Sequence, residues 1–232
     1  MKFRLITIAC ALHLLASCNL TKHAPTSNSA AKPAPTVLTP SQALAKLKQG
    51  NARFAEHHQQ NPNQGEHRLK ELVAGQHPVA TLLSCSDSRV PPEIVFDQGL
   101  GDLFVVREAG HVADEATLGS IEYAVEHLKT PLIVVMGHGS CGAVTAAVDA
   151  NHTHKPAEGN IQRIVEDITP AVKAAGDSGS RDSQIARAVT ANVKLVMKQI
   201  KADPALAEAL REGKLKIVGA VYDLHSGSIT WL

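Results

Sequence analysis

Aromatic residues are scarce in this chain, as are cysteines, long apolar runs and any surplus of charge. Phe, Trp and Tyr make up 3% of the 232 residues, so a core must be built largely from Val, Ile, Leu and Ala. Such a composition, with 44% hydrophobic residues, permits a full globular core and favours an α/β sheet over a β-sandwich. With 23 basic and 22 acidic residues the chain shows neither a basic patch nor an acidic tail, so we expect no nucleic-acid partner.

The apolar run near the amino terminus, Leu5–Leu15, is too short to span a membrane as a helix. It follows Lys2 and Arg4, which is the arrangement of a signal peptide. The residues that lead up to Cys18, Leu-Ala-Ser, resemble a bacterial lipobox. This resemblance implies that residues 1–17 are removed and that Cys18 is lipidated. An ordinary signal peptide that happens to precede a cysteine is the alternative.

Residues 18–39 differ in character, because their Ala, Pro and Ser residues follow no apolar period. A segment of this kind cannot bury enough apolar surface to fold, so we expect a lipidated cysteine and a flexible linker there. The folded domain is expected over residues 40–232. Together these features predict an exported lipoprotein, anchored to a bacterial membrane and facing the periplasm or the cell exterior.

Along the folded part, apolar strands alternate with helical patterns. Strands are expected over 79–85, 102–107, 132–136 and 216–222, and helices over 116–129, 160–175 and 182–201, with further helices from Pro40, after Cys141 and from Pro204. The stretches 57–67 and 91–101 are expected to form a solvated loop and a turn. Continuous apolar strands between helices predict an α/β fold with a mostly parallel central sheet flanked by helices. A turn at Ser226-Gly227 would add an antiparallel edge hairpin at the carboxyl end.

Only two cysteines, Cys85 and Cys141, lie beyond the first 18 residues. Cys85 ends one expected strand, and His138 follows another, three residues before Cys141. In an open α/β sheet, ligands bind at the carboxyl ends of the strands. Two thiolates and one imidazole suit zinc, and three protein ligands leave the fourth position open, as a catalytic zinc requires.

A disulfide between the two cysteines, or a pair of inert buried thiols, is the alternative interpretation. Neither explains why His138 stands three residues before Cys141. Neither explains why Asp87 and Arg89 follow Cys85 directly. We therefore favour the metal site.

Two short motifs, CSDSR at 85–89 and HGSCG at 138–142, resemble those of the β-class carbonic anhydrases. The similarity covers most of residues 40–232, and it includes the segments 47–54, 102–107, 120–125 and 218–223. The resemblance implies the β-carbonic anhydrase fold and one zinc ion per subunit. It also implies a lyase that reversibly hydrates carbon dioxide to bicarbonate and a proton, by attack of zinc-bound hydroxide.

The same resemblance implies that Cys85, His138 and Cys141 bind the zinc and that Asp87 and Arg89 form a catalytic dyad beside it. With Asp87 held by Arg89, the fourth zinc position is free for water. If Asp87 instead coordinates the metal, the site is closed. The sequence is compatible with both the open and the closed form of the site.

Four further residues match substrate-binding positions of the family. Gln76, nine residues before Cys85, matches a glutamine that is directed at the substrate in the plant-like subtype, and Gly142 offers a backbone N–H near the same place. Phe104 and Tyr123 match apolar pocket residues that family members supply from a neighbouring subunit. The resemblance therefore implies a homodimer or homotetramer that binds carbon dioxide and bicarbonate.

One departure from the family is His111, which stands where related sequences are expected to carry asparagine. A histidine at the rim of the site would suit the transfer of the released proton, because its ordinary pKa is about 6.5. We favour a structural or solvated role over this relay, because histidines at such positions more often have one.

Two other functions fit the same metal motif. One is hydrolysis of carbonyl sulfide or carbon disulfide on the same scaffold. The other is zinc binding without catalysis, although structural zinc sites are usually closed by four protein ligands.

Overall fold

The computed structural model describes residues 38–232. The expected signal peptide, Cys18 and the linker up to residue 37 lie outside this part. Among the described helices, none combines the length and the apolar character needed to cross a membrane.

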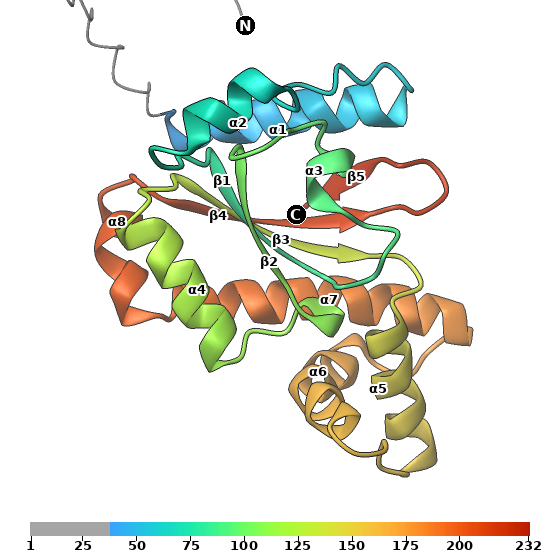
Figure 1. Cartoon of the computed structure of the whole chain (residues 1–232). Coiled ribbons are helices and arrows are strands. Elements are labelled where there is room, and N and C mark those ends of the chain that lie inside the picture. Colours follow the sequence, from blue (N-terminus) through green and yellow to red (C-terminus); the bar gives the residue numbers. More distant parts are fainter. Residues whose placement is uncertain (1–37) are drawn as a thin grey trace, which may run out of the picture. The chain divides into compact units, whose positions relative to one another are not determined.

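A five-stranded sheet with the strand order β2-β1-β3-β4-β5 lies at the centre of the described part (Figure 1). β1 (Ala80–Ser84), β2 (Leu103–Arg107), β3 (Leu132–His138) and β4 (Lys216–Tyr222) are parallel, and β5 (Ile229–Trp231) is antiparallel to β4. Every residue of β1 and β3 is buried, which explains why these strands are continuous apolar runs. The expected parallel sheet with an antiparallel edge is confirmed.

Helices cover both faces of this sheet (Figure 1). They are α1 (Pro40–Ala55), α2 (Glu66–Leu72), α3 (Pro92–Val95), α4 (Glu115–Glu126), α5 (Gly142–Thr153), α6 (Ile161–Ala175), α7 (Arg181–Lys201) and α8 (Ala207–Arg211), with short 3-10 turns at Ala109–His111 and Pro204–Leu206. Alternate strand residues divide between two core clusters. Leu82 packs in the same cluster as Leu47 of α1, whereas Leu83 packs with Ile121 of α4 and Val193 of α7.

The expected start of α1 is confirmed, because Thr39 caps it and Pro40 is its first residue. Thr39 and Gln42 form a reciprocal capping box. The sequence reading missed α2 and α3. Since α2 has seven residues and none of them is buried, it carries no apolar period that would have predicted a helix.

The position of the β1 and β3 ends follows from their register. Ser84, the last residue of β1, is paired with Met136 in β3. Cys85 therefore lies beside the end of β3, where His138 is the last residue. The sheet itself brings the two expected ligand motifs to one edge.

Close packing between α1 and α3 depends on Gly50. A Cβ atom at this position would lie 1.8 Å from the backbone oxygen of Phe96. The next residue, Asn51, is buried and donates to the carbonyl oxygens of Val95 (3.1 Å) and Gly227 (2.8 Å). α1 is thus attached to the end of α3 and to the turn between β4 and β5, and the contact at Gly50 leaves no room for a side chain.

We predict that Gly50→Ala lowers the free energy of unfolding by about 1–3 kcal/mol or more, because the added methyl group must push two backbones apart. Gly119→Ala is the matched control, since Gly119 also lies inside a helix but nothing lies within 4 Å of its Cβ position. That control should raise the free energy of unfolding by about 0.5–1 kcal/mol. Urea denaturation of the two variants checks both signs, and equal effects would contradict the packing argument.

Candidate metal centre

Three buried side chains meet at the carboxyl ends of β1 and β3. Cys85 follows β1, His138 ends β3, and Cys141 is the residue that precedes α5. Their ligand atoms all lie within 4.8 Å of one another. The two Sγ atoms are 3.9 Å apart and both cysteines are free, so the alternative of a disulfide, with its bond of about 2.05 Å, is excluded here.

The imidazole of His138 is oriented for metal binding. Its Nδ1 atom lies 2.9 Å from the carbonyl oxygen of Gly139. A carbonyl can only accept, so Nδ1 carries the proton and Nε2 has a free lone pair. Nε2 is buried and has no hydrogen-bond partner in the described part of the chain. A buried nitrogen without a partner, next to two thiols, fits a divalent metal with a preference for nitrogen and sulfur, such as zinc.

The sulfur of Cys85 lies in an environment that favours its thiolate. Hydrogen bonding from the Cys141 thiol, together with that from the Gly110 N–H, lowers the pKa of Cys85 to about 3 despite burial. The hydrogen bond that the Cys141 thiol donates to the Cys85 thiolate raises the pKa of Cys141, as do burial and the negative charge on Cys85. One thiolate therefore opposes the ionisation of the other, and a bound cation is what allows both to be ionised.

Beside the thiols, Asp87 and Arg89 form a bidentate ion pair. Asp87 Oδ1 accepts from both the backbone N and the Nε of Arg89 at 2.9 Å, and Oδ2 accepts from Nη2 at 2.7 Å. These bonds hold the pKa of the Asp87 carboxyl well below its usual range. Asp87 Oδ2 also lies 3.8 Å from the Nε2 atom of His138. The carboxylate is thus ionised, tied to Arg89 and close to the ligand atoms.

Arg107, which the sequence reading did not single out, holds the main chain of the cysteine loop. It donates from Nε to the carbonyl oxygen of Cys85 (3.0 Å) and from Nη2 to that of Asp87 (2.6 Å). Arg107 ends β2 and is paired with Ser84 in the sheet. A basic residue at the carboxyl end of an apolar strand, next to the ligand strand, was the signal that could have identified it.

The expectation that His111 lies at the rim of the site is wrong. The side chain is 0% exposed, and its Nε2 atom is 3.1 Å from the Nδ2 atom of Asn192. Burial lowers the pKa of His111 to about 4, so the ring is neutral at physiological pH. A ring that is neutral and closed off from solvent does not suit proton transfer to buffer.

Of the four expected substrate-binding residues, the structure brings only Gly142 next to the ligands of the same chain, as the first residue of α5. Gln76 precedes β1 and Phe104 is near the start of β2, so both lie toward the amino ends of parallel strands. Tyr123 of α4 is 48% exposed and contacts Phe104, with ring centroids 6.2 Å apart. Within one chain, these three residues are separated from the metal ligands.

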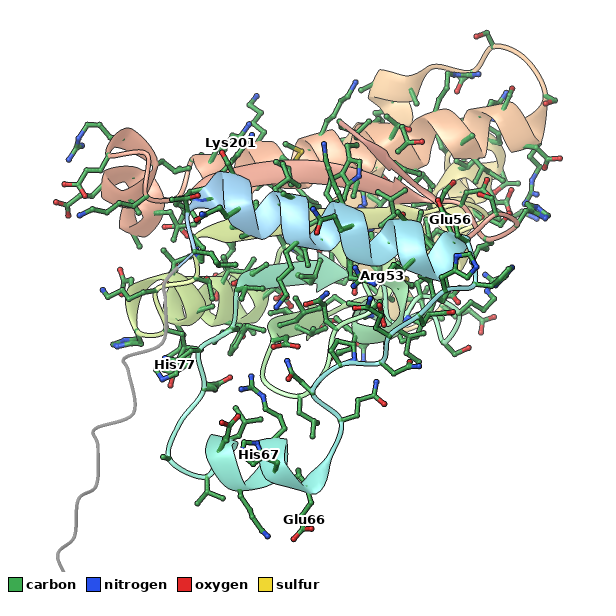
Figure 2. All side chains as sticks on the ribbon, turned by 90° about the horizontal axis from the view of Figure 1, so that it is seen from above. Arg53, Glu56, Glu66, His67, His77 and Lys201 are labelled. Atoms are coloured by element: carbon green, nitrogen blue, oxygen red, sulfur yellow. The ribbon has the colours of Figure 1, made fainter. Side chains whose placement is uncertain are left out.

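The segment that carries Gln76 stands at the outside of the fold. Figure 2 shows α2, labelled at Glu66 and His67, projecting away from the sheet, and the loop through His77 returning to it. Leu69 and Val73 of this segment are 55% and 88% exposed. An exposed apolar segment of this kind is typical of a contact surface.

Comparison with known proteins identifies one group of relatives. The pattern of the family described as Carbonic anhydrase matches residues 80–229. A carbonic anhydrase of Mycolicibacterium smegmatis is 45% identical over 190 residues, covering 82% of this chain and 92% of the relative. Carbonic anhydrase 2 of Mycobacterium tuberculosis is 46% identical over 190 residues, covering 81% and 90%.

Solved structures of the same kind resemble the fold. The β-carbonic anhydrase CafA of Aspergillus fumigatus has a TM-score of 0.64 and 30% identity, covering 83% of this chain and 89% of that one. One of two tetrameric β-carbonic anhydrases of Sordaria macrospora has a TM-score of 0.65 and 27% identity, covering 83% and 97%.

The Asp87–Arg89 geometry generates a prediction on ionisation. In Arg89→Gln, the pKa of Asp87 should rise toward its ordinary value of about 3.9, because the charged donor that holds it down is gone. A pKa that is depressed in the folded state stabilises the fold above the unfolded pKa, and this contribution is lost as pH falls. The variant should therefore lose less stability than the wild type on acidification. Carboxyl carbon NMR during a pH titration measures the shift.

Arg181→Gln is the matched control for this measurement. Arg181 makes the same bidentate contact with Asp149, at 3.0 and 2.7 Å, away from the metal ligands. Its removal should leave the titration of Asp87 unchanged. An Asp87 pKa that is equal in Arg89→Gln and in the wild type would refute the pairing.

Proposed function

This chain belongs to the β-class carbonic anhydrases, and from that premise we propose that it hydrates carbon dioxide reversibly with a zinc ion held by Cys85, His138 and Cys141. The observation that carries the proposal is the set of three buried ligand atoms within 4.8 Å of one another, with Nε2 of His138 left without a partner. Two sulfurs and one nitrogen suit zinc, and three ligands leave one position for a reactant.

Bound zinc supplies hydroxide at neutral pH, because it lowers the pKa of water to about 7. The residues around the site orient the reacting groups. Asp87 stays ionised and paired with Arg89, so its carboxylate would leave the fourth ligand position of a bound metal free. The same carboxylate, next to His138, can accept a hydrogen bond from a hydroxyl group and so orient it.

Gly142 contributes at the substrate side. It is the first residue of α5, and the N–H groups at the start of a helix have no partner inside the helix. A backbone N–H beside Cys141 can therefore donate to an oxygen of carbon dioxide or bicarbonate. The positive end of the helix dipole favours the anion.

We further propose that Gln76, Phe104 and Tyr123 complete the site of a second copy of the chain. Within one chain they lie at the amino ends of the strands, away from Cys85, and Tyr123 is half exposed. The exposed apolar residues Leu69 and Val73 and the tetrameric Sordaria relatives support an oligomer. In a homodimer or homotetramer each site would then combine zinc ligands of one subunit with apolar residues of another.

Export and lipidation at Cys18 remain a proposal that rests on the lipobox-like sequence. Cys18→Ser should leave the hydration activity unchanged but move the protein from the membrane fraction to the soluble fraction of the bacterial envelope. Fractionation of cells that express each form is the measurement. A wild-type protein recovered wholly in the soluble fraction would contradict the lipid anchor.

The central prediction is fast carbon dioxide hydration by the full chain loaded with one zinc ion. Stopped-flow measurement across pH 6.5–9 should show activity that is abolished in Cys85→Ser and kept in Arg181→Gln, whose substitution lies at the surface. Carbonyl sulfide and carbon disulfide should be poorer substrates. One bound zinc per chain without hydration above background would overturn the proposal, and faster turnover of a sulfur substrate would reassign the reaction.

A subunit-mixing experiment tests the shared site. Cys85→Ser and Gln76→Ala should each lose activity, because one lacks the metal and the other lacks a substrate donor. Unfolded together and refolded, they should recover about one quarter of wild-type activity, since random mixing makes half of the dimers hybrid and each hybrid has one intact site. If the mixture recovers nothing while hybrids are present, Gln76 does not act on the partner.

A further inference from the structure

We propose that Asn192, on α7, is a positioning residue for the metal centre. It holds the 3-10 turn Ala109–His111 in the one arrangement that keeps the Gly110 N–H hydrogen-bonded to the Cys85 sulfur. The inference rests on the proposed zinc site, and it assigns a role to a residue far from the ligand motifs in sequence.

A short series of contacts connects α7 to the sulfur. Asn192 Nδ2 donates to the carbonyl oxygen of Gly110 at 2.8 Å, and the N–H of Gly110 donates to Cys85 Sγ at 3.3 Å. The same Nδ2 atom lies 3.1 Å from Nε2 of His111, which its second hydrogen can reach. An amide nitrogen has two hydrogens, so one side chain can make both contacts at once. The two residues that Asn192 holds are those that shape the turn.

This turn needs to be held, because its backbone is strained. Gly110 and His111 have φ angles of 70° and 46°, which places two successive residues in the left-handed region. For a residue with a side chain, such as His111, that conformation is unfavourable and persists only when its surroundings impose it. A Cβ at Gly110 would also lie 2.6 Å from Cδ1 of Ile168. Asn192 supplies the polar contacts that keep the turn in this form.

The polar pair of Asn192 and His111 carries a cost in fold stability. Asn192 is 1% exposed and His111 is 0% exposed. Asn192 Oδ1 and His111 Nδ1 are buried without a hydrogen-bond partner in the described residues. Such unpartnered atoms lower stability, and the contact with the Gly110 carbonyl is what the polar pair provides in return. The cost of burying Asn192 and His111 is explained if the pair orients the Gly110 N–H toward the sulfur of Cys85.

The expected consequence concerns the bond between metal and sulfur. A hydrogen bond to a thiolate withdraws charge from the sulfur, so it changes how strongly that sulfur donates to a cation. Groups that contact ligands rather than the metal typically alter metal affinity by about 10–100-fold when removed. Loss of Asn192 should therefore weaken metal binding and change the electronic character of the Cys85–metal bond.

The same helix offers a matched control in Gln184. This amide is 7% exposed, its Oε1 is also buried without a partner, and its Nε2 donates to the carbonyl oxygens of Asp177 (2.6 Å) and Gly179 (3.3 Å). None of these contacts reaches the ligand motifs. Gln184→Leu thus removes an equally buried amide from α7 without touching the turn at Gly110.

The test uses the full chain loaded with cobalt(II), whose thiolate-to-metal absorption band reports on the sulfur donors. Asn192→Leu should shift this band and lower cobalt and zinc affinity by about 10–100-fold in competition with a chelator. Gln184→Leu should leave the band and the affinities unchanged, even where it lowers the melting temperature. An unshifted band and unchanged affinity in a folded Asn192→Leu protein would overturn the inference. A wild-type protein that shows no thiolate band would overturn the proposed metal site instead.

A second measurement needs no variant and covers the case in which Asn192→Leu does not fold. In the wild-type chain loaded with cadmium-113, a scalar coupling between the metal nucleus and the Gly110 amide proton should pass through the N–H···S hydrogen bond. Its detection supports the inference. Its absence, in spectra that show the couplings to the cysteine and histidine ligands, would overturn it.

Discussion

The parallel pairing of β1 with β3 is the constraint on which the site depends. Because Ser84 is in register with Met136, the residue after β1 and the last residue of β3 come to the same edge of the sheet. Both strands are fully buried and covered by helices, so neither can slip without exposing its apolar residues. The distance between Cys85 and His138 is therefore set by the core of the domain and not by the loops that carry the ligands.

The buried ligand side chains at the carboxyl ends of β1 and β3 also need their negative charge to be balanced. Two thiols and an imidazole are buried together, and the ionisation of Cys85 opposes that of Cys141. Three hydrogen-bond donors surround these groups. Arg89 donates to the Asp87 carboxylate, Arg107 donates to the carbonyl oxygens of the cysteine loop, and the Gly110 N–H donates to the sulfur of Cys85. All of these contacts restrain the ligand loop, but none neutralises two thiolates. A divalent cation completes the balance, and this is why the geometry favours a metal centre over a pair of inert thiols.

The same strand direction that assembles the ligands separates them from the other expected residues. Gln76 and Phe104 lie toward the amino ends of β1 and β2, whereas Cys85 follows the carboxyl end of β1, so the length of the strands separates them within one chain. The exposure of Tyr123 and of Val73 fits a contact with another copy of the chain. Catalysis and assembly would then depend on each other.

The alternation of strands and helices, the parallel sheet and the cluster of Cys85, His138 and Cys141 could be predicted from the sequence, because these are local signals: apolar runs, caps at Thr39 and Pro40, and Cys or His at strand ends. It did not find α2, whose residues are all at least partly exposed and follow no apolar period. The burial of His111, the hold of Arg107 on the cysteine loop and the contact of Asn192 with the turn at Gly110 became visible in the three-dimensional structure. These features depend on which segments pack against each other across tens of residues of sequence. Neither composition nor periodicity encodes which distant groups the packing brings within hydrogen-bond distance.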